Sequence, residues 1–179
     1  MHVWRVLCLC CLALLGGCLV SFEQGIPPEE AAPMPLLGDW QRQNEWGESQ
    51  YLSISHAGAQ RYRARLADDD DKFEEYPFTV RHHGRRWYLS AELPERLGGR
   101  HAWLGFELTR GNELVLFSLD IERVMRDVEE GRLAGSPFDT EEGEGLAIAS
   151  PLHEVLGYLD DPANAGLFVE VARFQRRAD

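Results

Sequence analysis

The sequence predicts an α+β fold, in which an antiparallel β-meander forms a curved sheet or a partly open barrel and two helices follow near the C-terminus. Short stretches of alternating apolar and polar residues are separated by brief turns, which is typical of antiparallel neighbours. After Asp120 the apolar spacing changes to that of an α-helix. The chain has 179 residues and a net charge of -12, which suits one domain with a short N-terminal extension.

Alternation predicts the strands of the meander, which opens at Gly38. Around Tyr62, every second residue is apolar and the residues between them are arginines, which is the period of a half-buried strand. The run Leu114–Phe117 is continuously apolar, so we expect that strand to be buried on both faces. The expected strands cover residues 50–55, 60–66, 74–82, 85–91, 102–108 and 114–117.

The C-terminal part is predicted to hold two helices and two more strands. Asp120 can cap a first helix, whose apolar residues fall at i, i+3, i+4 and i+7. A second helix starts at Pro151 and has an apolar face of the same spacing. Residues 145–149 and 167–174 are the expected strands, and residues 136–145 are expected to form an acidic loop.

The N-terminal residues 1–17 are predicted to be a targeting segment. Arg5 precedes an apolar run, Val6–Leu15, and two glycines follow, which is the pattern of a secretory signal peptide. The run is about half of the ~20 residues that a membrane-spanning helix needs. All four cysteines lie at or before Cys18, so the processed protein has no disulfide and no cysteine metal site.

The stretch Leu15-Gly16-Gly17-Cys18 resembles the lipobox of bacterial lipoproteins. The resemblance implies that the Cys18 thiol receives a diacylglyceryl group, that residues 1–17 are removed, and that Cys18 becomes an N-terminus acylated with a chain such as palmitate. Leu19 stands where an Asp would signal retention in the inner membrane. In a host with two membranes, we therefore expect a lipid-anchored protein on the periplasmic face of the outer membrane.

Residues 18–37 are predicted to be a lipidated tether. Four prolines fall between Leu19 and Leu37, and no strand or helix period appears. Proline restricts the backbone and removes donors, so an extended, semi-rigid spacer is expected. Residues 38–179 would then form a single globular domain.

The domain also resembles lipocalin-like proteins in two respects. Gly38-Asp39-Trp40 is similar to the Gly-x-Trp at the first strand of lipocalin-like barrels, in which the Trp plugs one end, although an ordinary core tryptophan explains the pattern too. The order of strands and helices is similar to that of small lipocalin-like envelope proteins of unassigned function. This resemblance implies a barrel whose interior is either a closed core or a ligand pocket.

The candidate ligand-binding residues are Arg61, Arg63, Arg65, Tyr62 and Trp87. The three arginines share one face of a strand and could bind an acidic ligand. Alternatively, ion pairs with Glu75 on the next strand could neutralise them. The apolar residues that could line a pocket, or equally fill a core, are Leu52, Ile54, Tyr62, Leu66, Phe78, Val80, Trp87, Leu89, Leu104 and Phe106.

No motif for catalysis, metal or cofactor binding is found in the sequence. Asp68–Asp71 lacks the spacing of an EF-hand loop, and the acidic cluster Asp139–Glu144 is interpreted as a solvated loop. The histidines lack metal-ligand spacing, and no nucleophile motif occurs. The acidic charge disfavours nucleic acid.

The leading hypothesis is therefore a non-catalytic, lipid-anchored envelope protein that binds a protein partner or supports envelope assembly. The anchor, the reach of the tether and the lack of an active-site motif motivate this hypothesis. The alternative is a lipocalin-like carrier of a small apolar ligand.

Overall fold

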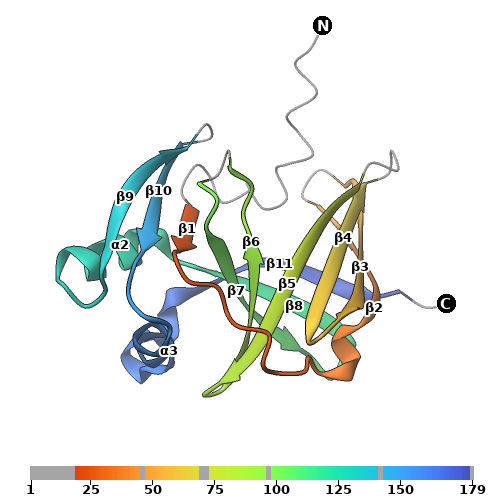
Figure 1. The fold of residues 1–179 in the computed structure, drawn as a ribbon. Coiled ribbons are helices and arrows are strands. Elements are labelled where there is room, and N and C mark those ends of the chain that lie inside the picture. The colour runs from red at the N-terminus through yellow and green to blue at the C-terminus, as the bar shows by residue number, and fades with distance from the viewer. Residues whose placement is uncertain (1–18, 45–46, 69–72, 96–97, 141–142, 178–179) are drawn as a thin grey trace, which may run out of the picture.

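The computed structural model describes residues 19–44, 47–68, 73–95, 98–140 and 143–177. These residues form one eleven-stranded sheet with two α-helices (Figure 1). The strands are β1 (Leu19–Phe22), β2 (Gly38–Gln43), β3 (Ser49–Gly58), β4 (Arg61–Asp68), β5 (Phe73–His83), β6 (Arg86–Glu92), β7 (His101–Leu108), β8 (Glu113–Leu119), β9 (Gly135–Thr140), β10 (Gly143–Ile148) and β11 (Phe168–Arg176). The helices are α2 (Ile121–Glu129) and α3 (Leu152–Asp160), with 3₁₀ turns η2 (Met34–Leu36) and η4 (Pro162–Leu167).

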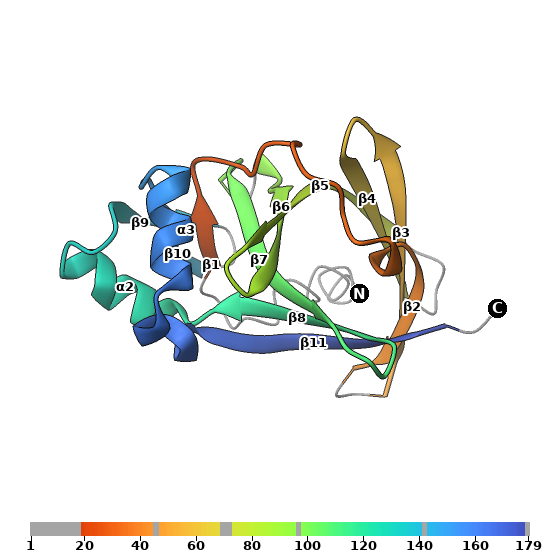
Figure 2. The ribbon, with the colours of Figure 1, turned by 90° about the horizontal axis from the view of Figure 1, so that it is seen from below.

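Eight of these strands close into an antiparallel barrel. Strands β2 to β8 pair in sequence order, and β11 lies between β8 and β2 (Figure 2). The pairing of β6 with β7 completes the ring. The predicted antiparallel meander with two following helices is confirmed, but the open edge that the sequence analysis allowed is not, because the eight strands pair in a continuous ring.

A second layer packs on the outside of the barrel. Strand β1 pairs with the start of β7 and runs parallel to β10, which pairs with β9. Asp120 caps α2 by accepting from the Arg123 backbone N–H at 3.2 Å, as expected. The apolar faces of α2 and α3 meet Tyr88 and Trp103, which point outward from β6 and β7, so the barrel has a separate hydrophobic core on this side. None of the described helices is both long and apolar enough to cross a bilayer.

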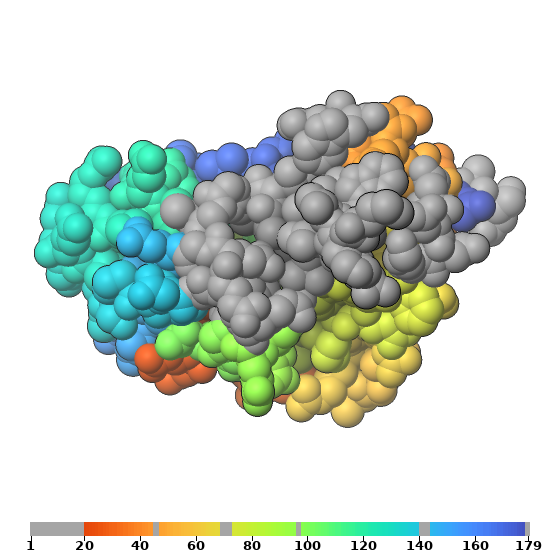
Figure 3. All heavy atoms as spheres, turned by 90° about the horizontal axis from the view of Figure 1, so that it is seen from above, coloured from red at the N-terminus to blue at the C-terminus, as the bar shows by residue number. Residues whose placement is uncertain are grey.

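This outer layer differs from the prediction at β9. Gly135–Thr140 forms a strand where an acidic loop was expected, because each of its residues pairs with β10. Pairing across a hairpin compensates for a sequence that carries Pro137 and little alternation. In Figure 3, seen from above, α2 (teal) and β10 (blue) lie at the opposite side of the molecule from β4 and β5 (yellow).

Residues 19–37 also differ from the predicted spacer, because they pack on the domain. Phe22 and Ile26 are buried, and Phe22 stacks on Trp103 with ring centroids 4.5 Å apart. The Thr79 hydroxyl donates to the Ile26 carbonyl at 2.5 Å, and the Ala32 N–H donates to the Tyr62 hydroxyl at 2.8 Å. The backbone is extended, as the prolines require, but it is held along the outside and one end of the barrel rather than free in solvent.

Candidate functional site

One end of the barrel, the lower end in Figure 1, is closed by large side chains. Trp40 is 1 % exposed, and its indole N–H donates to the Leu36 carbonyl of η2 at 3.1 Å. The Arg176 guanidinium lies 3.8 Å from the centre of the Trp40 ring and donates to backbone carbonyls of Pro35 and Leu37. Trp40 is therefore a buried core residue near one end of the barrel, which agrees with the ordinary core tryptophan that the sequence analysis considered.

A set of buried residues, which we call the barrel floor, includes Trp40. Cross-strand pairing and alternation place all of them on the inner face of the barrel or beneath it. The barrel floor consists of Leu36, Trp40, Leu52, Ile54, Tyr62, Phe78, Val80, Phe106, Leu114 and Phe174.

The opposite end, where β2, β4, β6 and β8 finish, is lined differently. We call its inward-facing residues the upper interior: Arg42, Gln50, Ala64, Leu66, Asp68, Glu74, Tyr76, Leu89, Ala91, Ala102, Leu104, Leu116, Ser118 and Ala172. Four of them are alanines, on β4, β6, β7 and β11. Small residues on several facing strands leave more space than the aromatic rings of the barrel floor.

Water reaches the upper interior, although its side chains point into the barrel. Seven of its apolar members are only partly buried: Ala64, Leu66, Leu89, Ala91, Ala102, Leu116 and Ala172. An inward-facing side chain can keep accessible surface only if it borders space that water can enter. An eight-stranded barrel is wide enough either to be filled by side chains or to hold one small ligand. All residues of the barrel floor are buried, whereas these seven residues of the upper interior keep accessible surface.

The polar groups of the upper interior gather mainly on β2 to β5. The Arg42 Nε donates to the Gln50 Oε1 at 2.5 Å, and another Arg42 nitrogen donates to the Val171 carbonyl at 3.3 Å. The Tyr76 hydroxyl donates to a Glu74 carboxylate oxygen. The upper interior is therefore amphipathic, with polar groups on one wall and apolar groups on the wall formed by β6, β7, β8 and β11.

Ser118 is the exception on the apolar wall. It lies two residues beyond Leu116 on β8 and is 6 % exposed, yet its Oγ has no hydrogen-bond partner among the described residues. A buried hydroxyl without a partner loses its hydrogen bonds to water and gains none in return. Its hydrogen-bonding capacity is therefore unused among the described residues.

A pocket open to solvent lies beside Arg42, and its other lining residues belong to the outer face of the barrel. Strand β2 pairs with β11 only at Trp40 and Gln41, so the two strands separate beyond those positions. A space of about 270 Å³ lies there, lined by Gln41, Arg42, Gln43, Ser49 and Gln175.

The structure does not bring the sequence-predicted ligand residues together. Arg61, Arg63 and Arg65 lie exposed on the outer face of β4, whereas Tyr62 is buried in the barrel floor. Arg63 approaches Glu75 at 3.6 Å, the ion pair that the sequence analysis considered, and Arg65 stacks 3.7 Å from the centre of the Phe73 ring.

Trp87 is the fifth predicted residue, and it faces inward near the lower end of the barrel. Its ring lies 5.8 Å from that of Phe106 and 5.0 Å from that of His82. It is partly exposed, at the opposite end from Arg42.

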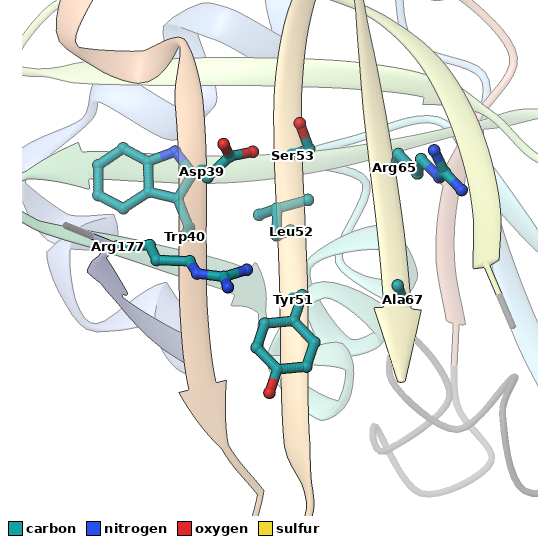
Figure 4. A pocket seen from close by; sticks show the side chains of 8 residues that line it. All are labelled: Asp39, Trp40, Tyr51, Leu52, Ser53, Arg65, Ala67 and Arg177. Carbon is teal, nitrogen blue, oxygen red and sulfur yellow. The ribbon is translucent and has the colours of Figure 1, made fainter. Parts of the chain in front are cut away.

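A shallow pocket of about 190 Å³ covers the outer face of β2, β3 and β4 (Figure 4). Arg177 lies over the Tyr51 ring, 5.4 Å from its centre. Figure 4 shows Arg65 turned away from Arg177, on the far side of β4. The two guanidinium groups therefore do not converge on one anion, and this pocket is a weaker candidate than the upper interior.

The outer layer holds one buried acid, Asp127, whose contacts are structural. Its carboxylate is 3.2 Å from the Arg132 guanidinium and accepts a hydrogen bond from the Tyr158 hydroxyl at 2.5 Å. Burial, followed by this hydrogen bond, raises the pKa of Tyr158 well above its ordinary value. These contacts join α2 to α3 and face no open space among the described residues.

Several predicted features fall outside the described residues. They are Cys18 with its lipobox, Asp69–Asp71 and the pair Glu141 and Glu142. Within the described part of the chain, no group of three histidine, cysteine or acidic side chains is placed to hold a metal ion.

Sequence reasoning missed Arg42, Ser118 and the four alanines as members of one site. The available signal was alternation: Arg42 is two residues from Trp40, and Ser118 is two residues from Leu116, so each shares the inward face of an apolar neighbour.

Comparison of the chain with protein-family models, with curated proteins and with solved structures found no match.

Proposed function

We propose that this protein is a lipid-anchored envelope protein that binds a small, mainly apolar ligand in the upper interior of its barrel, without catalysing a reaction. The observation that carries the proposal is the partial exposure of inward-facing apolar side chains, including Leu66, Leu89 and Leu116. Burying such surface under a ligand is favourable by roughly 25 cal/mol for each Å² removed from water.

The anchor supports the same proposal. A lipid on Cys18 would be joined directly to β1, and Phe22 of β1 pairs with His101, the first residue of β7 at the upper end of the barrel. Four residues span at most about 14 Å. Attachment at Cys18 would therefore hold the barrel within a short reach of the bilayer, which in a host with two membranes is the outer membrane facing the periplasm.

The alternative proposal is docking of a protein partner or support of envelope assembly. One of the sequence features that supported it does not agree with the structure. That alternative relied on a spacer that carries the domain away from the membrane. Because residues 19–37 pack on the barrel, the reach of that spacer is no longer available to support it.

Native mass spectrometry of the processed protein, gently extracted from its own membrane, tests the ligand proposal. We expect an extra small-molecule mass beyond the chain and its acyl groups. Ala64→Phe fills the upper interior and should abolish that mass, whereas Ala67→Phe, on the outer face of the same strand, should retain it. A protein without an extra mass, or equal loss in both variants, would contradict the proposal.

Stability measurements give an independent check of the space itself. Overpacking a filled core destabilises a protein by about 1–3 kcal/mol. If the upper interior is open, Ala64→Phe should lower the free energy of unfolding by less than this.

The lipid anchor has its own test: Cys18→Ser should leave the precursor unprocessed and unlipidated.

A further inference from the structure

We propose that the ligand of the upper interior carries a carboxylate or another single anionic group, and that Arg42 binds it. This inference rests on the proposed ligand-binding function and adds the chemical class of the ligand: an amphipathic molecule with an anionic head and an apolar tail.

Arg42 is directed into the barrel. It follows Trp40 by two residues on β2, and its guanidinium lies 5.0 Å from the centre of the Phe174 ring. Its hydrogen bond to the Val171 carbonyl places it at the bulge of β11, between Glu170 and Ala172. Ala172 pairs with Leu116, so the guanidinium lies beside the apolar wall of the upper interior.

No carboxylate among the described residues lies within ion-pair distance of Arg42. Its hydrogen-bond partners are an amide oxygen and a backbone carbonyl, both neutral. Two acids in the described part of the chain belong to the upper interior. Glu74 on β5 accepts from Tyr76. Asp68 on β4 pairs with Gln50 across the strands but forms no ion pair with Arg42. A guanidinium has five N–H donors, so Arg42 keeps donors for another partner. An anionic ligand would supply the counterion that Arg42 lacks among the described residues, through charge-assisted hydrogen bonds.

The surroundings of Arg42 divide into a place for the head and a place for the tail. The opening between β2 and β11 adjoins Arg42, so an anionic head could remain partly hydrated there. Leu116, Leu104 and Leu89 continue the apolar wall into the barrel.

The test compares two probes that share a ten-carbon chain, decanoate and 1-decanol. The processed protein is held in lipid nanodiscs, empty discs serve as the blank, and binding is measured by calorimetry at about pH 8, where a carboxylic acid is ionised. Charge-assisted hydrogen bonds are roughly twice as strong as neutral ones. We expect decanoate to bind at least about tenfold more tightly than decanol, a difference of about 1.4 kcal/mol.

Substitution assigns the preference to Arg42. Arg42→Gln should remove most of the preference for decanoate and leave decanol binding unchanged. Arg42→Lys keeps the charge and should retain part of the preference. Arg63→Gln removes an exposed arginine from the outer face of β4 and should change neither affinity. Melting temperatures identify any variant that fails to fold.

The outcomes separate this inference from the proposed function. If both probes bind and decanoate has no advantage, or if Arg42→Gln keeps the advantage, the anionic ligand class is wrong and the ligand-binding function stands. If neither probe binds, the proposed function fails together with the inference.

Discussion

The barrel floor and the upper interior are built on the same eight strands, yet they bury their inner faces to different degrees. At the floor, Trp40, Phe106 and Leu114 are at most 1 % exposed. Two residues away on the same strands, the inward places are taken by Arg42, Leu104 and Leu116, of which only Leu104 is buried, and alanines stand on β4, β6 and β11. Backbone pairing alone therefore does not decide whether a barrel is filled, because the size of the inward side chains does.

The difference also appears between neighbours on one strand. On β6, Leu89 points inward and is partly exposed, whereas Tyr88 points outward and is 2 % exposed. The outer layer of α2, α3, β1 and β10 covers Tyr88. On this side of the molecule, some side chains on the outside of the barrel are therefore more fully buried than some side chains on its inside.

The largest effect is expected at the floor. Trp40→Ala removes a buried ring together with its hydrogen bond to Leu36 and its contact with Arg176. Replacing a buried large aromatic by alanine costs about 3–5 kcal/mol. Denaturant unfolding measures the loss, and a cost below about 1 kcal/mol would show that Trp40 is not a well-packed core residue.

A matched pair on β8 tests the comparison directly. Leu114 and Leu116 share a strand, an inner face and a residue type, but Leu114 is 1 % exposed and Leu116 is partly exposed. Leu114→Ala should lower the free energy of unfolding by about 2–5 kcal/mol and Leu116→Ala by about 1 kcal/mol. Equal costs in the same unfolding assay would mean that the upper interior is as well packed as the floor.

Tyr88, on the outer face of β6, should make the free energy of unfolding fall at alkaline pH. Burial raises the pKa of Tyr88 from 10.0 to about 12. Between these values the unfolded chain releases the phenolic proton and the folded protein keeps it, so stability falls as pH rises. Wild type should therefore lose up to about 1 kcal/mol per pH unit more than Tyr88→Phe. Parallel curves for the two proteins, measured by unfolding at several pH values, would refute this.

The smallest effect is expected for Ser118→Ala in the ligand-free protein. The hydroxyl has no partner among the described residues, so its removal deletes no hydrogen bond. The free energy of unfolding should change by less than about 1 kcal/mol, and an increase is the expected sign. A clear loss of stability would indicate that the hydroxyl is bonded within the ligand-free protein.

Much of the meander was predictable because local alternation reports which face of a strand is buried. Leu52, Ile54 and Phe78 were placed on one face by their spacing and lie in the barrel floor. The same reasoning placed the arginines of β4 outside, where they are exposed. It also identified both C-terminal helices, because their apolar residues repeat at the helical period.

Long-range pairing was not predictable in the same way. β11 inserts between β8 and β2, and β1 joins residues 19–22 to β10. Such contacts join segments that are distant in the chain, such as Leu19 with Gly145 and Gln41 with Gln175, and no local pattern records the partner. For the candidate site, alternation put the predicted aromatic residues inside, but it could not show that Arg42, Ser118 and four alanines would face one another.

The sequence by itself determined the order and the inward faces of the barrel strands, but not β1 or β9, because side-chain direction along a strand follows from alternation alone. It also carries the motif that resembles a lipid-attachment signal, since a motif of that kind is a local string of residues. Only the tertiary structure decided that the ring closes, that residues 19–37 pack on it and that the inner space is filled at one end. Those features depend on side-chain volumes and backbone partners brought together from distant strands.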